Sequence, residues 1–273
     1  MRTATCLLLF ALCVSTAQAA ARPRIVSINP CVDAVLVQVA DPQQILGISH
    51  YSQDPRATSM PIEVARHFHA TSGTAEEVVA LAPDLVMSGP HVSPATIFAL
   101  ERLRIPIMKF TVAASVAQSE QEIRNIALAV GEPARGEKVI ASIERALAEA
   151  RPPDSKTVPT LMWMSGGMVP GTGTLADELL QRTGFRNMSA AYGLQQWDVL
   201  PLEYLLASPP AMVLSLAPDD AVGDRMLLHP AVMKLKERVP FRAYPFRLLQ
   251  CGGPTIIQAV ARLSAVRREL EPR

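Results

Sequence analysis

The feature that most constrains the fold is a regular alternation of short apolar segments with amphipathic ones, interrupted once near the middle of the chain. Strands separated by helices of this length form right-handed βαβ crossovers and a largely parallel sheet. The sequence therefore predicts an α/β fold. The predicted strands are Arg24–Ile28, Ile45–Ser49, Leu85–Met87, Ile105–Phe110, Val158–Met164, Met212–Leu216 and Phe241–Phe246. The predicted helices between them are Val32–Val39, Thr74–Leu81, Pro94–Leu103, Leu175–Thr183, Leu202–Ala207 and Thr255–Glu269.

The interruption consists of two helices that follow each other without a strand between them. Ser115–Val130 and Ala134–Ala150 are both helical in pattern, and only Gly131-Glu132-Pro133 separates them. We expect this connector, residues 115–153, to join an N-terminal lobe (20–114) to a C-terminal lobe (154–273). Ligands of open parallel sheets bind beyond the carboxyl ends of the strands, and pockets favour domain interfaces. The expected binding site is therefore a cleft between two lobes.

Residues 1–19 have the three-part pattern of a secretory signal peptide. Met1-Arg2 is positively charged, Cys6–Val14 is apolar, and Ser15–Ala19 supplies small residues at a cleavage site after Ala19. The apolar run is too short for a membrane span, which needs about 20 residues. Neither Cys6 nor Cys13 follows a stretch typical of a lipid anchor. We expect a soluble protein exported to the periplasm.

The charge of the mature chain argues against several classes of partner. Arg2 is the only charged residue in the first nineteen, so acidic and basic residues balance after cleavage. A neutral chain is not attracted broadly to nucleic acid or to an anionic membrane. Two of the four cysteines leave with the signal peptide, and Cys31 and Cys251 remain. A single pair of cysteines is not a disulfide framework.

Three predicted loops of the first half follow strands and should meet at one edge of the sheet. They contribute Asn29, Pro30 and Cys31, then His50 and Tyr51, then Gly89 and His91 as candidate ligand-binding residues. A thiol and two imidazoles suit borderline metals, so Cys31, His50 and His91 form an alternative direct metal site. The other reading is that the cysteine is a small buried residue and that the histidines are hydrogen-bonded loop residues. No cofactor is predicted.

The second half carries aromatic residues at positions expected to be loops. Trp163 closes a strand, and Tyr192 and Trp197 lie in a long segment, where Gln195, Gln196 and Asp198 indicate exposure. Aromatic groups at loop positions suit a large, flat ligand, because they bury much area with few lost rotamers. Ordinary core packing is the competing interpretation.

The last predicted helix opens with Cys251-Gly252-Gly253-Pro254. The glycines allow close backbone approach, and free amides at a helix start can hold an anionic group. Cys251 and Gly252 are therefore candidate ligand-binding residues. Cys31 and Cys251 can form a disulfide in the oxidising periplasm, or they can face the ligand as thiols. The sequence leaves this choice open.

Enzyme function is the weaker interpretation. Ser165 lacks the first glycine of a nucleophile elbow. Gly171–Ala176 matches the Gly-x-Gly-x-x-Ala pattern of dinucleotide binding, but Ser165–Pro170 separates it from the preceding strand, so the tight turn is lost. A periplasmic α/β hydrolase remains the alternative outside the binding proteins, together with a sensor subunit.

Several segments resemble the class III periplasmic binding proteins, the helical-backbone receptors for cobalamin, ferric siderophores and haem. The opening strand and the second strand are similar, and the match is most specific in a segment that runs Glu-Glu-Val-Val-Ala-Leu-Ala-Pro-Asp-Leu-Val. The matching segments are Arg24–Pro30, Ile45–Ser49, Glu76–Val86, Leu202–Leu206 and Leu228–Ala231. The resemblance spans almost the whole mature chain.

The resemblance implies a function and partners. It implies a monomeric receptor that captures a bulky metal chelate between two lobes held by one long helix, here Ala134–Ala150. The receptor would deliver the chelate to the permease and ATPase of an ABC importer. Glu76 and Glu203 match the glutamates, one on each lobe, that dock onto arginines of the permease in the cobalamin receptor. The segment Ser208–Met212 departs from the family pattern, because it lacks the usual aspartate before its strand.

Overall fold

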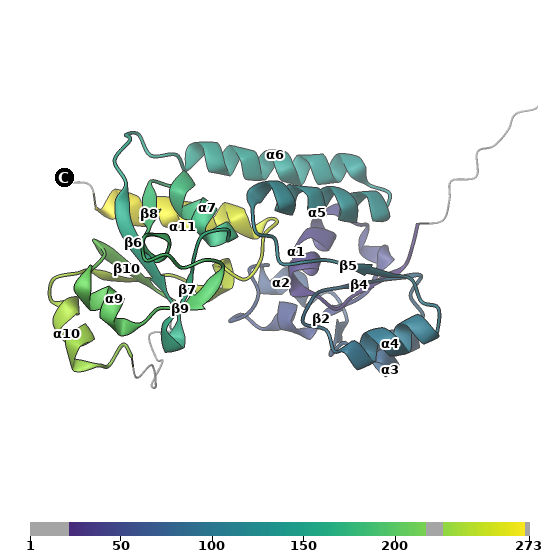
Figure 1. Ribbon diagram of the computed structural model, residues 1–273. Helices are drawn as coiled ribbons and strands as arrows, with labels where there is room; N and C mark the ends of the chain where they lie inside the picture. The colour runs from purple at the N-terminus through teal and green to yellow at the C-terminus, as the bar shows by residue number, and fades with distance from the viewer. Residues whose placement is uncertain (1–21, 217–225, 271–273) are drawn as a thin grey trace, which may run out of the picture.

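The chain folds into two lobes that lie side by side, with one long helix running along both (Figure 1). This computed structural model describes residues 22–216 and 226–270, so the predicted signal peptide, residues 1–19, lies outside the described residues. In those two ranges no helix combines the length and the apolar character needed to cross a membrane.

The first lobe is built on a fully parallel five-stranded sheet of order β3-β2-β1-β4-β5. Its strands are β1 (Ile25–Ser27), β2 (Ile45–Ser49), β3 (Ala70–Thr71), β4 (Leu85–Ser88) and β5 (Ile107–Lys109). Its helices are α1 (Pro30–Val39), α2 (Ile62–Ala65), α3 (Ala75–Ala80) and α4 (Pro94–Arg102), and a 3₁₀ turn, η2 (His50–Gln53), follows β2.

Two helices then follow without a strand, as the sequence predicts: α5 (Val116–Ala129) and α6 (Pro133–Glu149). The buried residues Val139, Ile143 and Leu147 recur along α6 at intervals of four, which is the spacing of one apolar helix face. That face packs on α5 and on the last helix of the chain. The opposite face of α6 is exposed along the top of both lobes in Figure 1.

The second lobe is built on a parallel sheet of order β11-β10-β6-β8. Its strands are β6 (Val158–Trp163), β8 (Phe185–Asn187), β10 (Met212–Ser215) and β11 (Phe241–Ala243). An antiparallel ribbon of β7 (Met168–Pro170) and β9 (Trp197–Val199) adjoins it. Its helices are α7 (Leu175–Arg182), α8 (Met188–Ala191), α9 (Leu202–Ala207), α10 (Pro230–Lys236) and α11 (Thr255–Glu269), and a 3₁₀ turn, η4 (Phe246–Leu248), follows β11.

The two lobes repeat one topology. In each, a central strand (β1 or β6) is flanked on one side by the second strand (β2 or β8) and on the other by β4 or β10. The helix before that flanking strand is α3 in the first lobe and α9 in the second. Elements at equivalent positions of the two lobes can therefore be compared directly.

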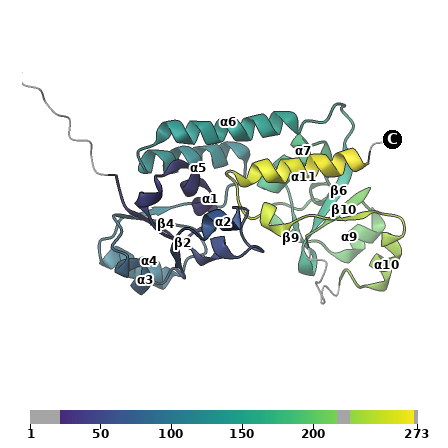
Figure 2. The ribbon, with the colours of Figure 1, turned by 180° about the vertical axis from the view of Figure 1, so that it is seen from behind.

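One hydrophobic core runs through both lobes. It includes Leu36 of α1, Ile123 of α5, Ile143 of α6, Met212 of β10 and Leu263 of α11, all of them buried. The family resemblance implied that one long helix holds the lobes together, and α6 runs along both lobes as that implies (Figure 1). It shares one core with α5 and α11, and Figure 2 shows α11 lying beside α6 from behind.

Candidate functional site

The loops after β1 and β4 meet at the carboxyl edge of the first sheet, as expected. Asn29 begins α1, because its side-chain Oδ1 accepts a hydrogen bond from the Cys31 amide at 2.9 Å, and Pro30 occupies the first helical turn. Gly89 lies so close to Asn29 that an added Cβ would be 2.5 Å from the Asn29 Nδ2 atom. A larger residue at position 89 would displace the Asn29 amide.

A buried carboxylate that the sequence analysis did not select holds the loop after β2. Asp33 of α1 is fully buried, and its Oδ2 accepts hydrogen bonds from the Ser49 amide (2.9 Å) and the Ser52 hydroxyl (2.6 Å). The other oxygen, Oδ1, has no hydrogen-bond partner in the described part of the chain. Burial raises the pKa of Asp33 to about 7, against the hydrogen bonds from serines, which lower it. A charged residue inside the apolar run Val32–Val39 was the available signal.

The turn that Asp33 holds exposes two aromatic rings. His50 and Tyr51 are adjacent and solvent-exposed, and their ring centroids are 4.1 Å apart. The Nδ1 atom of His50 lies 3.2 Å from the carbonyl oxygen of Thr71. Because a carbonyl only accepts, Nδ1 carries the proton in the neutral ring, and Nε2 is left as an acceptor. His91 is exposed in the turn after β4.

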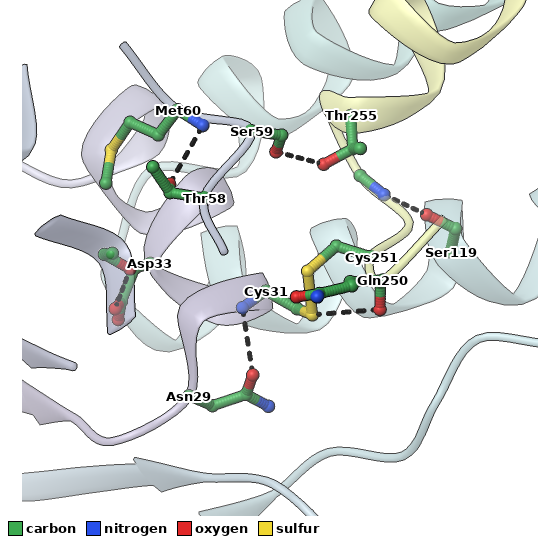
Figure 3. The surroundings of a disulfide bond; sticks show 12 residues. Asn29, Cys31, Asp33, Thr58, Ser59, Met60, Ser119, Gln250, Cys251 and Thr255 are labelled. Atoms are coloured by element: carbon green, nitrogen blue, oxygen red, sulfur yellow. Dashed lines mark hydrogen bonds between the residues drawn. A yellow bond between two sulfur atoms is a disulfide. The ribbon is translucent and has the colours of Figure 1, made fainter. Parts of the chain in front are cut away.

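Cys31 and Cys251 form a disulfide, with their Cα atoms 5.1 Å apart (Figure 3). The sequence had left this pairing open. The bond excludes the alternative metal site of Cys31, His50 and His91, because the Cys31 thiolate is no longer available as a ligand. Among the described residues, no group of three or more histidine, cysteine or acidic side chains is placed to hold a metal ion.

The segment around Cys251 is fastened to the first lobe by further contacts, several of which are drawn in Figure 3. The Gly253 amide donates to Ser119 Oγ of α5 at 2.6 Å, and the hydroxyls of Ser59 and Thr255 are 2.5 Å apart. An added Cβ at Gly252 would lie 2.6 Å from Ser119 Oγ, so only glycine permits this approach. The expectation of free amides for an anion is therefore wrong at Gly253, because its amide already has a partner.

The aromatic candidates of the second lobe separate into buried and exposed residues. Trp163 is the last residue of β6, and its side chain is completely buried in the second-lobe core. The Tyr192 hydroxyl donates to the carbonyl of Ser208 at 2.5 Å. Ser208 precedes β10, so this contact is at the amino end of that strand, away from the expected binding edge. Neither side chain is placed for ligand contact.

Trp197 is the candidate that stays exposed. It lies in β9, opposite Pro170 of β7, and 38% of its surface is accessible. Met168 and Val199 pair across the same ribbon and are also exposed. The ribbon follows the carboxyl end of β6, and Figures 1 and 2 both show it on the side of the second lobe that faces the first.

The glycine-rich segment before α7 has a structural explanation. Thr174 caps α7 by accepting a hydrogen bond from the Asp177 amide. The Gly171 amide donates to the Gln196 carbonyl, and an added Cβ at Gly171 would lie 2.5 Å from the Leu194 carbonyl oxygen. The glycine therefore serves packing against the chain before β9, and its amide is not available to a phosphate.

A hollow lies beside the disulfide, between α1, α5 and the segment after Cys251. It is shallow and partly open to solvent. It is lined by Asn29, Cys31, Val32, Val35, Phe110, Thr111, Ser119, Glu122, Ile126, Gly252 and Gly253. The predicted residues Asn29, Cys31 and Gly252 are thus brought together, whereas Glu122 was not predicted.

Glu76 and Glu203 occupy equivalent positions of the two lobes. Each is the second residue of a six-residue helix, α3 or α9, and each is exposed. Thr74 caps α3 by accepting from the Glu77 amide, as the sequence predicted. In the two described ranges, the side chains of Glu76 and Glu203 make no hydrogen bond or ion pair.

Comparison with known proteins supports the fold and identifies the family. A family model, periplasmic binding protein, matches residues 25–236. No curated protein matched the sequence. The fold is similar to that of the periplasmic heme-binding protein RhuT from Roseiflexus sp. RS-1, with a TM-score of 0.75 and 23% identity over 91% of this chain and 99% of that chain.

Two Vibrio cholerae structures are also similar. The periplasmic heme-binding protein HutB has a TM-score of 0.72 and 18% identity, over 89% of this chain and 98% of that chain. The periplasmic vitamin B12 binding protein BtuF has a TM-score of 0.68 and 14% identity, over 91% of this chain and 98% of that chain. With two parallel sheets joined through consecutive helices, the resemblance seen in the sequence is confirmed, and the chain belongs to the class III periplasmic binding protein family.

Proposed function

We propose that this chain is the periplasmic solute-binding component of an ABC importer, and that it captures a bulky metal chelate between its lobes. The chelate classes that fit are a corrinoid, a haem or a ferric siderophore. The similar structures named above bind heme or vitamin B12, which supports this choice of classes. The predicted signal peptide, residues 1–19, supports export to the periplasm, and we propose that the mature protein acts as a monomer.

The observation that carries the proposal is a pair of exposed aromatic groups at the facing edges of the two sheets. His50 and Tyr51 follow β2 of the first lobe, and Tyr51 is 55% exposed. Trp197 lies on the ribbon of the second lobe, beside the exposed apolar residues Met168 and Val199. Aromatic side chains at these positions suit a flat apolar ring that binds between them.

The fluorescence of the chain's two tryptophans allows chelate binding to be measured directly. Titration with haem, cobinamide and a ferric siderophore should quench the exposed Trp197 more than the buried Trp163. In Trp197→Phe, the remaining emission comes from Trp163, and quenching should fall. Tyr51→Ala should weaken binding of the preferred chelate roughly tenfold, about 1.4 kcal/mol, because a stacked ring of this kind contributes that order of energy.

Tyr204→Ala is the matched control, since Tyr204 is 51% exposed but lies on α9. It should leave the affinity unchanged. Absence of binding by all three chelates would refute the proposed ligand class. Equal losses in Tyr51→Ala and Tyr204→Ala would show that the aromatic edge of the first lobe is not the binding surface.

The importer role rests on the two glutamates. Figure 1 shows α3 and α9 on the side of the molecule opposite α6, one on each lobe, and Figure 2 agrees. We propose that Glu76 and Glu203 contact basic residues of the permease on this side. Exposed charges at an interface rim mainly steer and orient the partner, so their loss should affect transport rather than chelate affinity.

A further inference from the structure

The hollow beside the disulfide is lined by an amide donor that no other described residue uses. The donor belongs to Asn29, which as a whole residue is 8% exposed. Its Oδ1 is used by the Cys31 amide, and its Nδ2 has no partner among the residues that the structure describes. Figure 3 shows the amide nitrogen pointing away from Cys31. This amide group reaches solvent and is available to donate to an acceptor on a ligand.

The same hollow contains a carboxylate without a cation. Glu122 of α5 is partly buried and accepts a hydrogen bond from the Thr111 hydroxyl at 3.1 Å. No lysine, arginine or histidine in the described ranges pairs with it. Burial raises the pKa of Glu122, because the surrounding protein solvates the charge less well than water does. Val32, Val35 and Ile126 make the rest of the wall apolar.

From this arrangement we infer that the hollow is a subsite for an uncharged polar group at the edge of the chelate. A primary amide or a hydroxyl has both an acceptor for Asn29 Nδ2 and a donor for the Glu122 carboxylate. A carboxylate accepts from Asn29 but repels Glu122, and the apolar wall strengthens that repulsion. The subsite therefore favours chelates whose periphery carries amides or hydroxyls over those that carry carboxylates. This inference rests on the proposed chelate function.

The test compares ligands that share one ring and differ only in these peripheral groups. Suitable pairs are dicyanocobinamide with dicyanocobyrinic acid, and haem bis-amide with haem. The wild-type protein should bind the amide member of a pair roughly tenfold more tightly, which corresponds to about 1.4 kcal/mol. Glu122→Gln removes the charge and keeps the shape, so it should reduce this ratio to less than about threefold, mainly by improving binding of the acid.

Two further variants check the assignment. Asn29→Asp keeps an oxygen to cap α1 but removes the amide donor, so it should weaken binding of the amide ligand. Glu120→Gln is the matched control, since Glu120 is a neighbouring carboxylate on α5 whose pKa burial also raises, yet it does not line the hollow. It should leave the amide-to-acid ratio unchanged. Thermal unfolding confirms that each variant is folded.

The outcomes distinguish failure of the subsite from failure of the proposed chelate-binding function. If the wild type binds either pair and Glu122→Gln does not change the ratio, or Glu120→Gln changes it equally, the subsite is wrong while chelate binding stands. A preference for the acid member would also overturn the subsite. If the wild type binds no member of either pair, the proposed function fails for ring chelates, and the subsite fails with it.

Discussion

Removal of the Cys31–Cys251 disulfide should destabilise the protein strongly. The bond joins residues 220 positions apart, so nearly the whole mature chain lies inside the loop that it closes. The chain-entropy relation gives a stabilisation of about 5 kcal/mol for a loop of this length. We therefore expect the double substitution Cys31→Ser and Cys251→Ser to lower the free energy of unfolding by about 3 to 5 kcal/mol.

The assay is equilibrium unfolding in urea, followed by tryptophan fluorescence and by far-UV circular dichroism. Wild-type protein treated with a reductant is the matched control, because it keeps both sulfur atoms and loses only the covalent bond. The reduced wild type and the double variant should unfold at the same urea concentration. The slope with urea should rise for both, since a chain without the cross-link exposes more surface on unfolding.

The same substitution should act locally in the native state. Amide hydrogens of residues 250–255 and of the first turn of α1 should exchange faster, because the hydrogen bonds from Gly253 and between Ser59 and Thr255 would then hold this junction alone. A loss below about 1 kcal/mol with an unchanged slope would refute the chain-entropy reasoning. It would mean that the unfolded chain retains residual structure, so that the cross-link removes little entropy from it.

Three further predictions follow from single contacts. The pKa of Asp33 is about 7 in the folded protein against an ordinary value of 3.8, so its contribution to stability is present below pH 4 and is lost as the pH rises through 7. Asp33→Asn should therefore gain stability relative to wild type between pH 4 and pH 8, by up to about 4 kcal/mol in urea unfolding, and a constant difference would contradict this. Gly252→Ala should lower the unfolding temperature by several degrees, since its Cβ would clash with Ser119 Oγ, and an unchanged temperature would argue against the close approach. Glu76→Arg with Glu203→Arg should reduce uptake in cells without changing chelate affinity. Glu149→Arg, on α6, should leave both uptake and affinity unchanged. Normal uptake by the double variant would rule out this docking side.

Long periodic elements were predictable, and very short ones were not. The helix Thr255–Glu269 has the predicted bounds, and the consecutive helices of the connector lie within a residue or so of the prediction. The strands Ala70–Thr71 and Phe185–Asn187 were missed, as was the ribbon of Met168–Pro170 with Trp197–Val199. Segments of two or three residues show no measurable alternation, and they become strands only because a neighbouring strand supplies hydrogen-bond partners.

The site was partly predictable, because the order of strands and loops along the chain indicates which loops meet. The strand-end rule placed Asn29, Gly89 and the His50-Tyr51 pair at one edge, because parallel strands direct their carboxyl ends to the same side. The rule could not separate Trp163 from Trp197. One is completely buried and the other is 38% exposed, although both were candidates for ligand contact. Burial depends on which distant side chains cover a residue, and that information is not local.

Local patterns in the sequence are enough to predict the α/β alternation, the two halves with a helical connector, and the family. Apolar periodicity and segment order express these features, and both are local properties of the chain. The tertiary structure alone decided that Cys31 bonds Cys251, that Asp33 holds the turn of His50 and Tyr51, and that Asn29 and Glu122 share one hollow. Each of these depends on the packing of segments that are distant along the chain, in the disulfide's case by 220 positions, and local patterns carry no information about that packing.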